Sequence, residues 1–380
     1  MRAQQRVDYD VVLVDGLFDV DNRILLEAGG SAGDTLRRFV VVDDVVDRLY
    51  GSRIREYFAH HGVESRIMAM AVSEQAKTLD AVSRIVAGFD EFGLDRRREP
   101  VIGIGGGVLL DTLGVAAGLY RRGIPYIRVP TTLIGLVDAG VGVKTAVNHG
   151  QHKNRLGSYY APVAALLDRE FLRTLDERHV VNGLAEILKI ALIRDECLFE
   201  LLETHGGLLV EQRFAGRPAG SSAGDGDDVA FEVLDRATTG MLDELRPNLW
   251  EKVLDRLVDY GHSISPTIEM LALPELLHGE AVAIDMSLFT VLACRRGLVT
   301  RHQRDRILRV VRDLGLPTRH PLLEPAVLSR ALADTVRHRD GMQRMPMPVG
   351  IGAGCFVNDI SESELALAAK ELHELEVDGG

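Results

Sequence analysis

Hydrophobic residues in the first half of the chain form short runs that alternate with longer stretches of helical periodicity. The runs predict strands at residues 9–14, 39–42, 66–71, 101–104 and 125–130. The stretches between them predict helices at residues 46–60, 76–92 and 108–120. Strands that alternate with helices in this way are typical of a mostly parallel sheet, so we expect an α/β domain.

The pattern changes near residue 165. Residues 166–205 and nearly everything after Phe231 have the spacing of amphipathic helices, which predicts a mainly α-helical second half. We therefore divide the chain into domains at residues 1–165 and 166–380. Residues 216–228 are rich in Gly, Ser and Asp and poor in apolar residues, and we expect them to form a mobile surface loop.

Composition narrows the class of protein. The 380 residues are 46% hydrophobic and carry a formal net charge of −12, which fits a globular protein and argues against nucleic acid or an anionic membrane as the main partner. The three cysteines are far apart, as in a reduced protein. The polar N-terminus and the lack of an apolar stretch of roughly 18 residues predict a cytoplasmic protein.

A glycine run separates the expected strand 101–104 from the expected helix 108–120. Gly105, Gly106 and Gly107 have no Cβ atoms, so the backbone can turn sharply and approach a phosphate at the helix N-terminus. The run is not a Rossmann fingerprint, because Val108 stands where a third glycine is needed, and it lacks the Gly-Lys-Ser/Thr of a P-loop. A bound nucleotide is the first hypothesis, and a tight turn without ligand is the alternative.

A second cluster lies in the helical half. Asn182, Glu186 and Lys189 share one stripe of a mostly apolar helix, where they either need buried partners or form an ion pair on a solvated edge. His262 and His278 both stand beside glycines and lead into apolar helical stretches. One carboxylate and two imidazoles suit a catalytic divalent metal, usually zinc, although each histidine alone is more often structural.

A third cluster spans residues 138–157, where several glycines separate Lys144 from Lys153 and Asn154. This mixture of donors favours a loop that wraps a phosphate or a polyhydroxy ligand. A solvated charged loop is the alternative.

Taken in order, the motifs of the chain resemble the dehydroquinate synthase superfamily of sugar phosphate cyclases, and the resemblance covers nearly the whole chain. They are Gly105-Gly-Gly-Val-Leu-Leu-Asp111, Arg121-Arg-Gly123, Pro130-Thr-Thr-Leu133, Asp138, Lys144-Thr145, Lys153-Asn154, Asn182-Gly-Leu-Ala-Glu-Ile-Leu-Lys189, Gly261-His262 and His278-Gly-Glu280. The resemblance implies an N-terminal NAD-binding α/β domain, a C-terminal helical domain, an active site in the cleft between them, and a homodimer.

The resemblance also implies a role for each matching residue. Glu186, His262 and His278 would bind a zinc or cobalt ion. NAD would contact Asp43, Glu74, Lys77, Gly105, Gly106, Gly107, Asp111, Thr131 and Thr132. The sugar would be faced by Asp138, Lys144, Lys153, Asn154 and Lys189. Arg122 would reach the phosphate, and whether it does so within its own subunit or from the neighbouring one stays open.

Departures from dehydroquinate synthase itself indicate a different substrate. That enzyme has Asn-Phe-Gly-His-Thr followed by a further histidine, where this chain has Asp259-Tyr-Gly-His262-Ser and then Pro266. The chain is similar to sedoheptulose 7-phosphate cyclases instead. Leu245, Asp259 and His338 resemble the set of 2-epi-5-epi-valiolone synthases, whereas desmethyl-4-deoxygadusol synthases would carry Glu, Ala and Thr.

The implied reaction is transient oxidation of sedoheptulose 7-phosphate by NAD, phosphate elimination, reduction and intramolecular aldol closure. The product would be 2-epi-5-epi-valiolone, a C7 cyclitol for an aminocyclitol-type natural product such as an antibiotic. Ala146 and Gln151 stand where these cyclases usually have glycine, so 2-epi-valiolone and desmethyl-4-deoxygadusol stay open as products. A metal-dependent NAD polyol dehydrogenase and a cofactor-binding protein without turnover are the alternatives from other classes.

Overall fold

A computed structural model describes residues 6–29, 36–150, 152–215 and 228–377, and the chain divides into two compact units between Thr174 and Leu175. The division falls later than residue 165 because β8 (Ala164–Asp168) and a 3-10 turn at Arg169–Thr174 belong to the first unit. The prediction of helix from residue 166 was therefore wrong at its start. The apolar run of β8 is buried throughout, and such a run cannot be told from a buried helix by periodicity.

The first unit contains a parallel sheet with strand order β1-β8-β5-β4-β2-β3. The other strands of this sheet are β1 (Asp10–Val14), β2 (Arg37–Asp43), β3 (Glu64–Met70), β4 (Val101–Gly105) and β5 (Tyr126–Pro130). Its central strands are buried on both faces, as their nearly continuous apolar runs require. The strands expected from the sequence are confirmed within a few residues.

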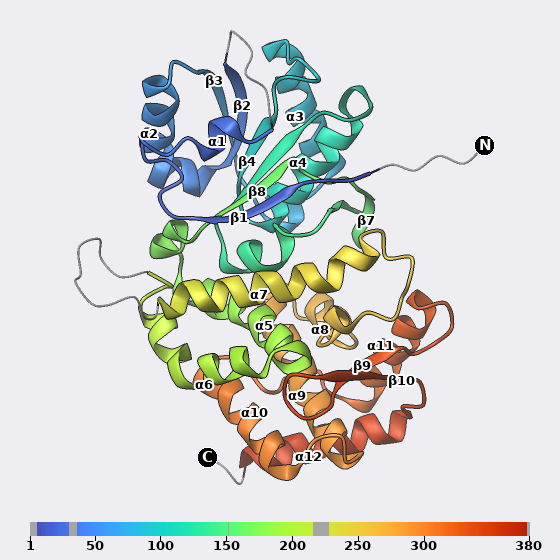
Figure 1. The fold of residues 1–380 in the computed structure, drawn as a ribbon. Coiled ribbons are helices and arrows are strands. Elements are labelled where there is room, and N and C mark those ends of the chain that lie inside the picture. The colour runs from blue at the N-terminus through green and yellow to red at the C-terminus, as the bar shows by residue number, and fades with distance from the viewer. Residues whose placement is uncertain (1–5, 30–35, 151, 216–227, 378–380) are drawn as a thin grey trace. The chain divides into compact units, whose positions relative to one another are not determined.

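Helices cover both faces of this sheet (Figure 1). They are α1 (Ile24–Glu27), α2 (Asp44–His60), α3 (Leu79–Phe92) and α4 (Gly107–Leu119). Successive residues of β2 point to opposite faces, so Phe39 and Val41 pack with α3 and α4, whereas Val40 and Val42 pack with α1 and α2. The sheet therefore has one apolar core on each side.

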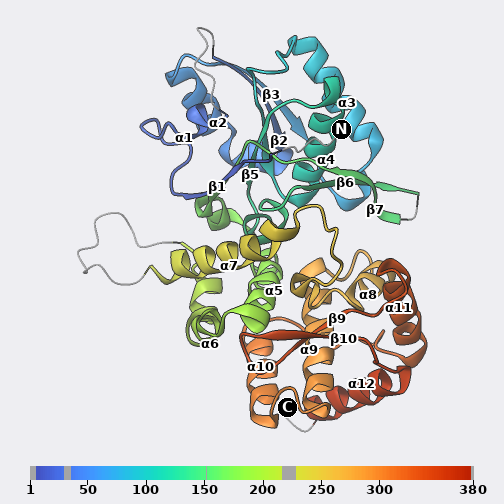
Figure 2. The same ribbon diagram turned by 45° about the vertical axis from the view of Figure 1, so that its right-hand side comes forward.

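An antiparallel hairpin follows the sheet's fifth strand along the chain. It consists of β6 (Lys144–His149) and β7 (His152–Tyr159), and β6 packs on α4 through Val147 and Thr145. Most of the third cluster of the sequence, which spans residues 138–157, thus lies on a defined hairpin, and its first residues precede β6 (Figure 2).

The second unit is mainly helical, as expected. Its helices are α5 (Glu177–Arg194), α6 (Glu196–Glu211), α7 (Val229–Leu245), α8 (Ser265–Leu271), α9 (His278–Arg295), α10 (Arg301–Asp313), α11 (Pro325–His338) and α12 (Glu362–Val377). Helices α5 and α9 contact each other and are buried along most of their length, because both are apolar on nearly all sides. The loop expected at 216–228 lies outside the described residues except for Asp228, which caps α7.

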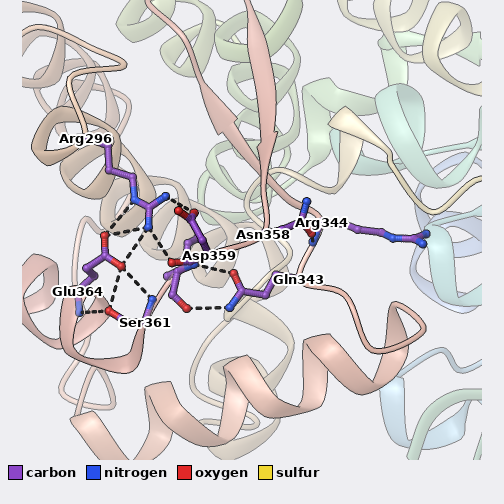
Figure 3. Close-up of polar contacts among 8 residues, drawn as sticks. Arg296, Gln343, Arg344, Asn358, Asp359, Ser361 and Glu364 are labelled. Atoms are coloured by element: carbon purple, nitrogen blue, oxygen red, sulfur yellow. Dashed lines mark hydrogen bonds and ion pairs between the residues drawn. The ribbon is translucent and has the colours of Figure 1, made fainter.

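The helical prediction for the last part of the chain missed one hairpin, β9 (Met345–Pro348) with β10 (Gly354–Val357). Figure 3 shows how polar side chains join the residues around this hairpin to the end of α9. Arg296 pairs with Asp359 at 2.6 Å and Glu364 at 2.8 Å, and the Gln343 side chain exchanges two hydrogen bonds with the Ile360 backbone. None of the described helices is long and apolar enough to span a bilayer.

Candidate functional site

The glycine run forms the turn from β4 into α4. Gly105 ends the strand, Gly106 precedes the helix, and no side chain caps this helix end. A Cβ on Gly105 would lie 3.1 Å from Leu109 Cβ and 3.3 Å from Asp43 Cβ, and one on Gly107 would lie 3.1 Å from Ala139 Cβ. The glycines therefore let neighbouring segments converge on the N–H groups of the first helical turn, an arrangement that fits the pyrophosphate of a dinucleotide.

Other predicted cofactor residues lie at the same edge of the sheet, because β2, β4 and β5 are adjacent parallel strands. Asp43 ends β2 and accepts a hydrogen bond from Val45 N at 2.8 Å, and burial raises the pKa of its carboxyl. Thr131 follows β5, is buried, and donates its N–H to the Gly105 carbonyl at 3.1 Å. Thr132 Oγ1 accepts from Gly135 N at 3.1 Å.

A buried lysine connects residues from separate parts of the sequence. Lys77 Nζ donates to Asp111 Oδ2 and to Asn154 Oδ1, both at 2.6 Å, and Lys77 is only 3% exposed. Burial raises the pKa of Asp111, and the Lys77 ammonium opposes that shift. The structure thus brings a residue of the expected sugar site, Asn154, into contact with Lys77 of the expected NAD site, and Lys77 also binds Asp111.

Asn148 extends this network and was not among the predicted site residues. Its Nδ2 donates to the Glu74 carbonyl at 3.0 Å and to Glu74 Oε1 at 2.9 Å. Its Oδ1 accepts from Asn154 N at 2.8 Å, which holds Asn154 at a positive φ of 52°. The hairpin is therefore tied to the segment that carries Glu74 and Lys77.

The other residues of this unit that were predicted to bind the sugar phosphate lie between α4 and β7 or on the hairpin. Asp138 is half-buried in a single π-helical turn at Gly135–Ala139, Lys144 is exposed at the start of β6, and Lys153 is half-buried on β7. Arg122 is exposed in a turn after α4 and has a positive φ of 67°.

In the second unit, the polar stripe of α5 is buried. Glu186 is 0% and Lys189 2% exposed, and their side chains form an ion pair, so the alternative of a solvated edge was wrong. Asn182 Oδ1 accepts from Gly279 N at 2.6 Å, which joins α5 to the first turn of α9.

Glu186, His262 and His278 converge on one point. One potential ligand atom from each lies within 4.8 Å of the other two. Glu186 Oε1 is 3.6 Å from His262 Nε2 and 3.4 Å from His278 Nε2. Oε2 of the buried Glu186 carboxylate pairs with Lys189, and Oε1 faces the two imidazole nitrogens, so one carboxylate and two imidazoles form a donor set that fits a divalent metal.

Each imidazole has an acceptor beside its Nδ1 atom. His278 Nδ1 lies 2.9 Å from Glu269 Oε2, and His262 Nδ1 lies 3.1 Å from the Tyr260 carbonyl. A proton on each Nδ1 satisfies these acceptors and leaves Nε2 as the lone pair for a metal. Glu269 was missed from the sequence, because its place on α8 has no spacing relation to His278.

Charges in this cluster determine its protonation. Burial would raise the pKa of Glu186, but the Lys189 ammonium and the two imidazoles hold it well below its usual value. Burial lowers the pKa of His262. Burial also acts to lower the pKa of His278, but Glu186 and Glu269 outweigh it and raise that pKa to about 10. The site therefore keeps an ionised carboxylate in the interior.

The three residues expected to distinguish the substrate lie at the ends of elements in this unit. Leu245 is the last residue of α7 and His338 the last of α11, where it is exposed. Asp259 lies 3.3 Å from Arg256 and 3.9 Å from Arg339 across ion pairs. Two guanidinium groups therefore fix its carboxylate three residues before His262.

Both halves of the chain match one known family. Residues 67–182 match the 3-dehydroquinate synthase N-terminal domain, and residues 183–336 match the 3-dehydroquinate synthase C-terminal domain. The chain belongs to the 3-dehydroquinate synthase family. The expected fold class, an α/β domain with a mostly parallel sheet and a mainly helical domain, is confirmed by the sheet, the helices and these matches.

Within this family the chain is similar to proteins named 2-epi-5-epi-valiolone synthase. One from Actinoplanes sp. is 60% identical over 378 residues, which are 100% of this chain and 94% of that protein. One from Actinomyces sp. is 57% identical over 98% of this chain and 97% of that protein. The solved structure of ValA from Streptomyces hygroscopicus, a 2-epi-5-epi-valiolone synthase with NAD⁺ and Zn²⁺ bound, has a TM-score of 0.91 at 50% identity and covers 99% of both chains. The resemblance to this branch of the sugar phosphate cyclases is confirmed.

Proposed function

We propose that this protein is a sedoheptulose 7-phosphate cyclase that forms 2-epi-5-epi-valiolone and phosphate, and is thus a carbon-oxygen lyase. The observation that carries the proposal is the 60% identity to a 2-epi-5-epi-valiolone synthase along the whole chain. The buried Glu186, His262 and His278 cluster supports it, because this donor set suits a catalytic metal.

The cofactor assignment follows from the two sites. We propose that Glu186, His262 and His278 bind zinc or cobalt. The residues proposed to bind NAD are Asp43, Glu74, Lys77, Gly105, Gly106, Gly107, Asp111, Thr131 and Thr132. In this reaction class NAD accepts and returns a hydride, and a divalent metal polarises a substrate oxygen as a Lewis acid.

The chain's own polar groups bind and orient the sugar phosphate in this proposal. Lys144, Lys153 and Arg122 compensate the phosphate charge, and Asp138 and Asp259 accept hydrogen bonds from hydroxyls. Lys189, fixed by its ion pair with Glu186, and His338 complete the set of polar groups that we assign to the substrate.

The structure suggests how Asn154 acts in this set. Its carbonyl oxygen accepts from Lys77, and its amide N–H groups can donate to a ligand. We therefore propose that Asn154 meets the sugar phosphate as a donor.

One incubation separates this function from its rivals. Metal-loaded protein is mixed with sedoheptulose 7-phosphate and a substoichiometric amount of NAD⁺, and inorganic phosphate and NADH absorbance are followed. The cyclase releases many phosphates per NAD⁺ without accumulating NADH, because the net reaction is redox-neutral. A polyol dehydrogenase would accumulate NADH and release no phosphate, and absence of phosphate release would refute the proposal.

Two further measurements complete this experiment. NMR of the product distinguishes 2-epi-5-epi-valiolone from 2-epi-valiolone and desmethyl-4-deoxygadusol. Glu186→Ala and His278→Ala should lose bound metal and turnover together. Full activity in either variant would overturn the ligand assignment.

We also propose that the protein is a cytoplasmic homodimer that supplies a C7 cyclitol to an aminocyclitol-type antibiotic or related natural product. Light scattering of the purified protein tests the dimer. If Arg122 acts across subunits, mixing an Arg122→Ala variant with a Lys144→Ala variant should restore part of the activity that each lacks alone.

A further inference from the structure

A buried arginine in the central sheet has no role in the site described so far. Arg128 lies in the middle of β5 and is 0% exposed. Among the described residues, no carboxylate lies within ion-pair distance of it, although its charge acts to lower the pKa of Asp111, and its Nε has no hydrogen-bond partner. A buried charge without an ionic partner is costly, so its contacts require an explanation.

Its guanidinium binds one short segment of backbone. Nη1 donates to the carbonyls of Ala139 at 3.1 Å and Gly142 at 2.5 Å, and Nη2 donates to the carbonyl of Lys144 at 3.0 Å. These carbonyls extend from the last residue of the π-helical turn that contains Asp138 to the first residue of β6. One side chain therefore satisfies backbone acceptors that no sheet or helix ladder would satisfy.

The guanidinium is itself held in place. Nη2 donates to the Tyr126 hydroxyl at 2.9 Å, and that hydroxyl donates to the Tyr160 carbonyl at 2.7 Å, just past the end of β7. The rings of Tyr126 and Tyr160 stack with centroids 5.7 Å apart. Arg128 thus connects a rigid central strand to the first and last residues of the hairpin region.

We propose that Arg128 is a positioning residue for the sugar phosphate: its planar fork fixes the backbone that presents Asp138 and Lys144. The kinetic part of this inference rests on the proposed function. A lysine cannot replace the fork, because an ammonium is a compact charge on a flexible stem that cannot span the three carbonyls in one plane.

The sequence offers a matched control. Arg38 lies on β2 of the same sheet, is 2% exposed, and donates to the carbonyls of Arg37 at 2.9 Å and Leu26 at 3.3 Å, neither of which adjoins a predicted site residue. Arg128→Lys and Arg38→Lys therefore make the same chemical change at two equally buried positions. A merely structural role for Arg128 predicts equal consequences for the two variants.

Two readouts test the inference. Hydrogen exchange of amides 139–145 should be faster by about tenfold or more in Arg128→Lys and unchanged in Arg38→Lys, since each lost hydrogen bond from a charged donor corresponds to at least that factor. With sedoheptulose 7-phosphate, Arg128→Lys should lower kcat/KM by about tenfold or more, with KM rising, while the NAD⁺ dissociation constant changes less than about threefold. Arg38→Lys should change neither kinetic parameter.

The exchange measurement needs no substrate and tests by itself whether Arg128 fixes this backbone. Unchanged exchange in residues 139–145, or an equal kcat/KM in the two variants, would overturn it. Failure of the wild-type protein to release phosphate would refute the proposed function instead, with the exchange result still deciding the role of Arg128. If Arg128→Lys does not fold, Tyr126→Phe, which removes one acceptor of the guanidinium, should increase exchange in the same segment.

Discussion

The carboxylate of Glu269 should contribute strongly to metal affinity although it is not a predicted ligand. It lies 2.9 Å from His278 Nδ1 and is buried, and it holds the ring with Nε2 turned toward Glu186. Glu269→Gln keeps the shape of the side chain but removes its charge. The amide can still accept from Nδ1, so the ring should stay in place while the hydrogen bond weakens.

The size of the effect follows from this one contact. A buried hydrogen bond to a charged group contributes about 1.5–3 kcal/mol, and a loss of about 2 kcal/mol corresponds to about a thirtyfold weaker metal complex. Removing a residue that hydrogen-bonds to a metal ligand typically lowers metal affinity by roughly 10- to 100-fold, and the value expected here lies within that range. We therefore expect Glu269→Gln to weaken Zn²⁺ binding about thirtyfold, and Glu269→Ala to weaken it more.

Competition with a chromophoric chelator measures the Zn²⁺ dissociation constant directly. Glu275→Gln is the control, since Glu275 is an exposed carboxylate in the same segment and should leave the constant unchanged. Turnover at saturating metal should recover substantially in Glu269→Gln, because the three ligands remain. Wild-type affinity in both Glu269 variants would refute the reasoning.

Two further predictions concern stability. Burial raises the pKa of Asp285 from 3.8 to about 6, so the folded protein binds this proton more tightly than the unfolded chain does. The stability that this proton contributes is complete below pH 3.8 and is lost as the pH rises through about 6. The free energy of unfolding of Asp285→Asn, measured in urea, should therefore rise relative to wild type by up to about 3 kcal/mol between these pH values. A difference between the two proteins that does not change with pH would contradict this. Gly279→Ala should unfold the protein or abolish metal binding, because the new Cβ would overlap the backbone carbonyl oxygen of Asn182. In the control Gly207→Ala on α6, the new Cβ meets nothing within 4 Å, and Tm should rise slightly. Equal Tm values for the two variants would refute the packing argument.

The elements that could be predicted from the sequence are those whose pattern is local. The strands of the first unit have short apolar runs, and α3 has apolar spacing with Thr78 as its N-cap and Gly93 as its C-cap. The strand β8 was missed because its run is uniformly apolar and stands directly before a long helical stretch. The hairpin of β9 and β10 was missed because two four-residue strands between helices give no measurable period.

Predicted site residues fall into two kinds. Glu186 and Lys189 could be found because polar groups on a buried helical stripe are visible in one helix. Their convergence with His262 and His278 could only be inferred through the family resemblance, since the histidines are separated from Glu186 by 76 and 92 positions along the sequence. Whether residues so far apart along the sequence meet in space depends on tertiary packing.

Two residues that sequence reasoning missed, Arg128 and Asp285, share a different feature: each is a polar group inside an apolar segment and has backbone groups as its partners. Arg128 interrupts Tyr126-Ile-Arg-Val-Pro130, and Asp285 interrupts the apolar run of α9. Burial of such groups is expensive, so the interruption itself predicts that a partner exists. It cannot predict which one, because Arg128 binds carbonyls that every sequence has and Asp285 accepts from the N–H groups of Ile264 and Ser265. Backbone partners leave no trace in the sequence, and for this reason the groups that hold a site in place are harder to predict than the groups that carry its chemistry.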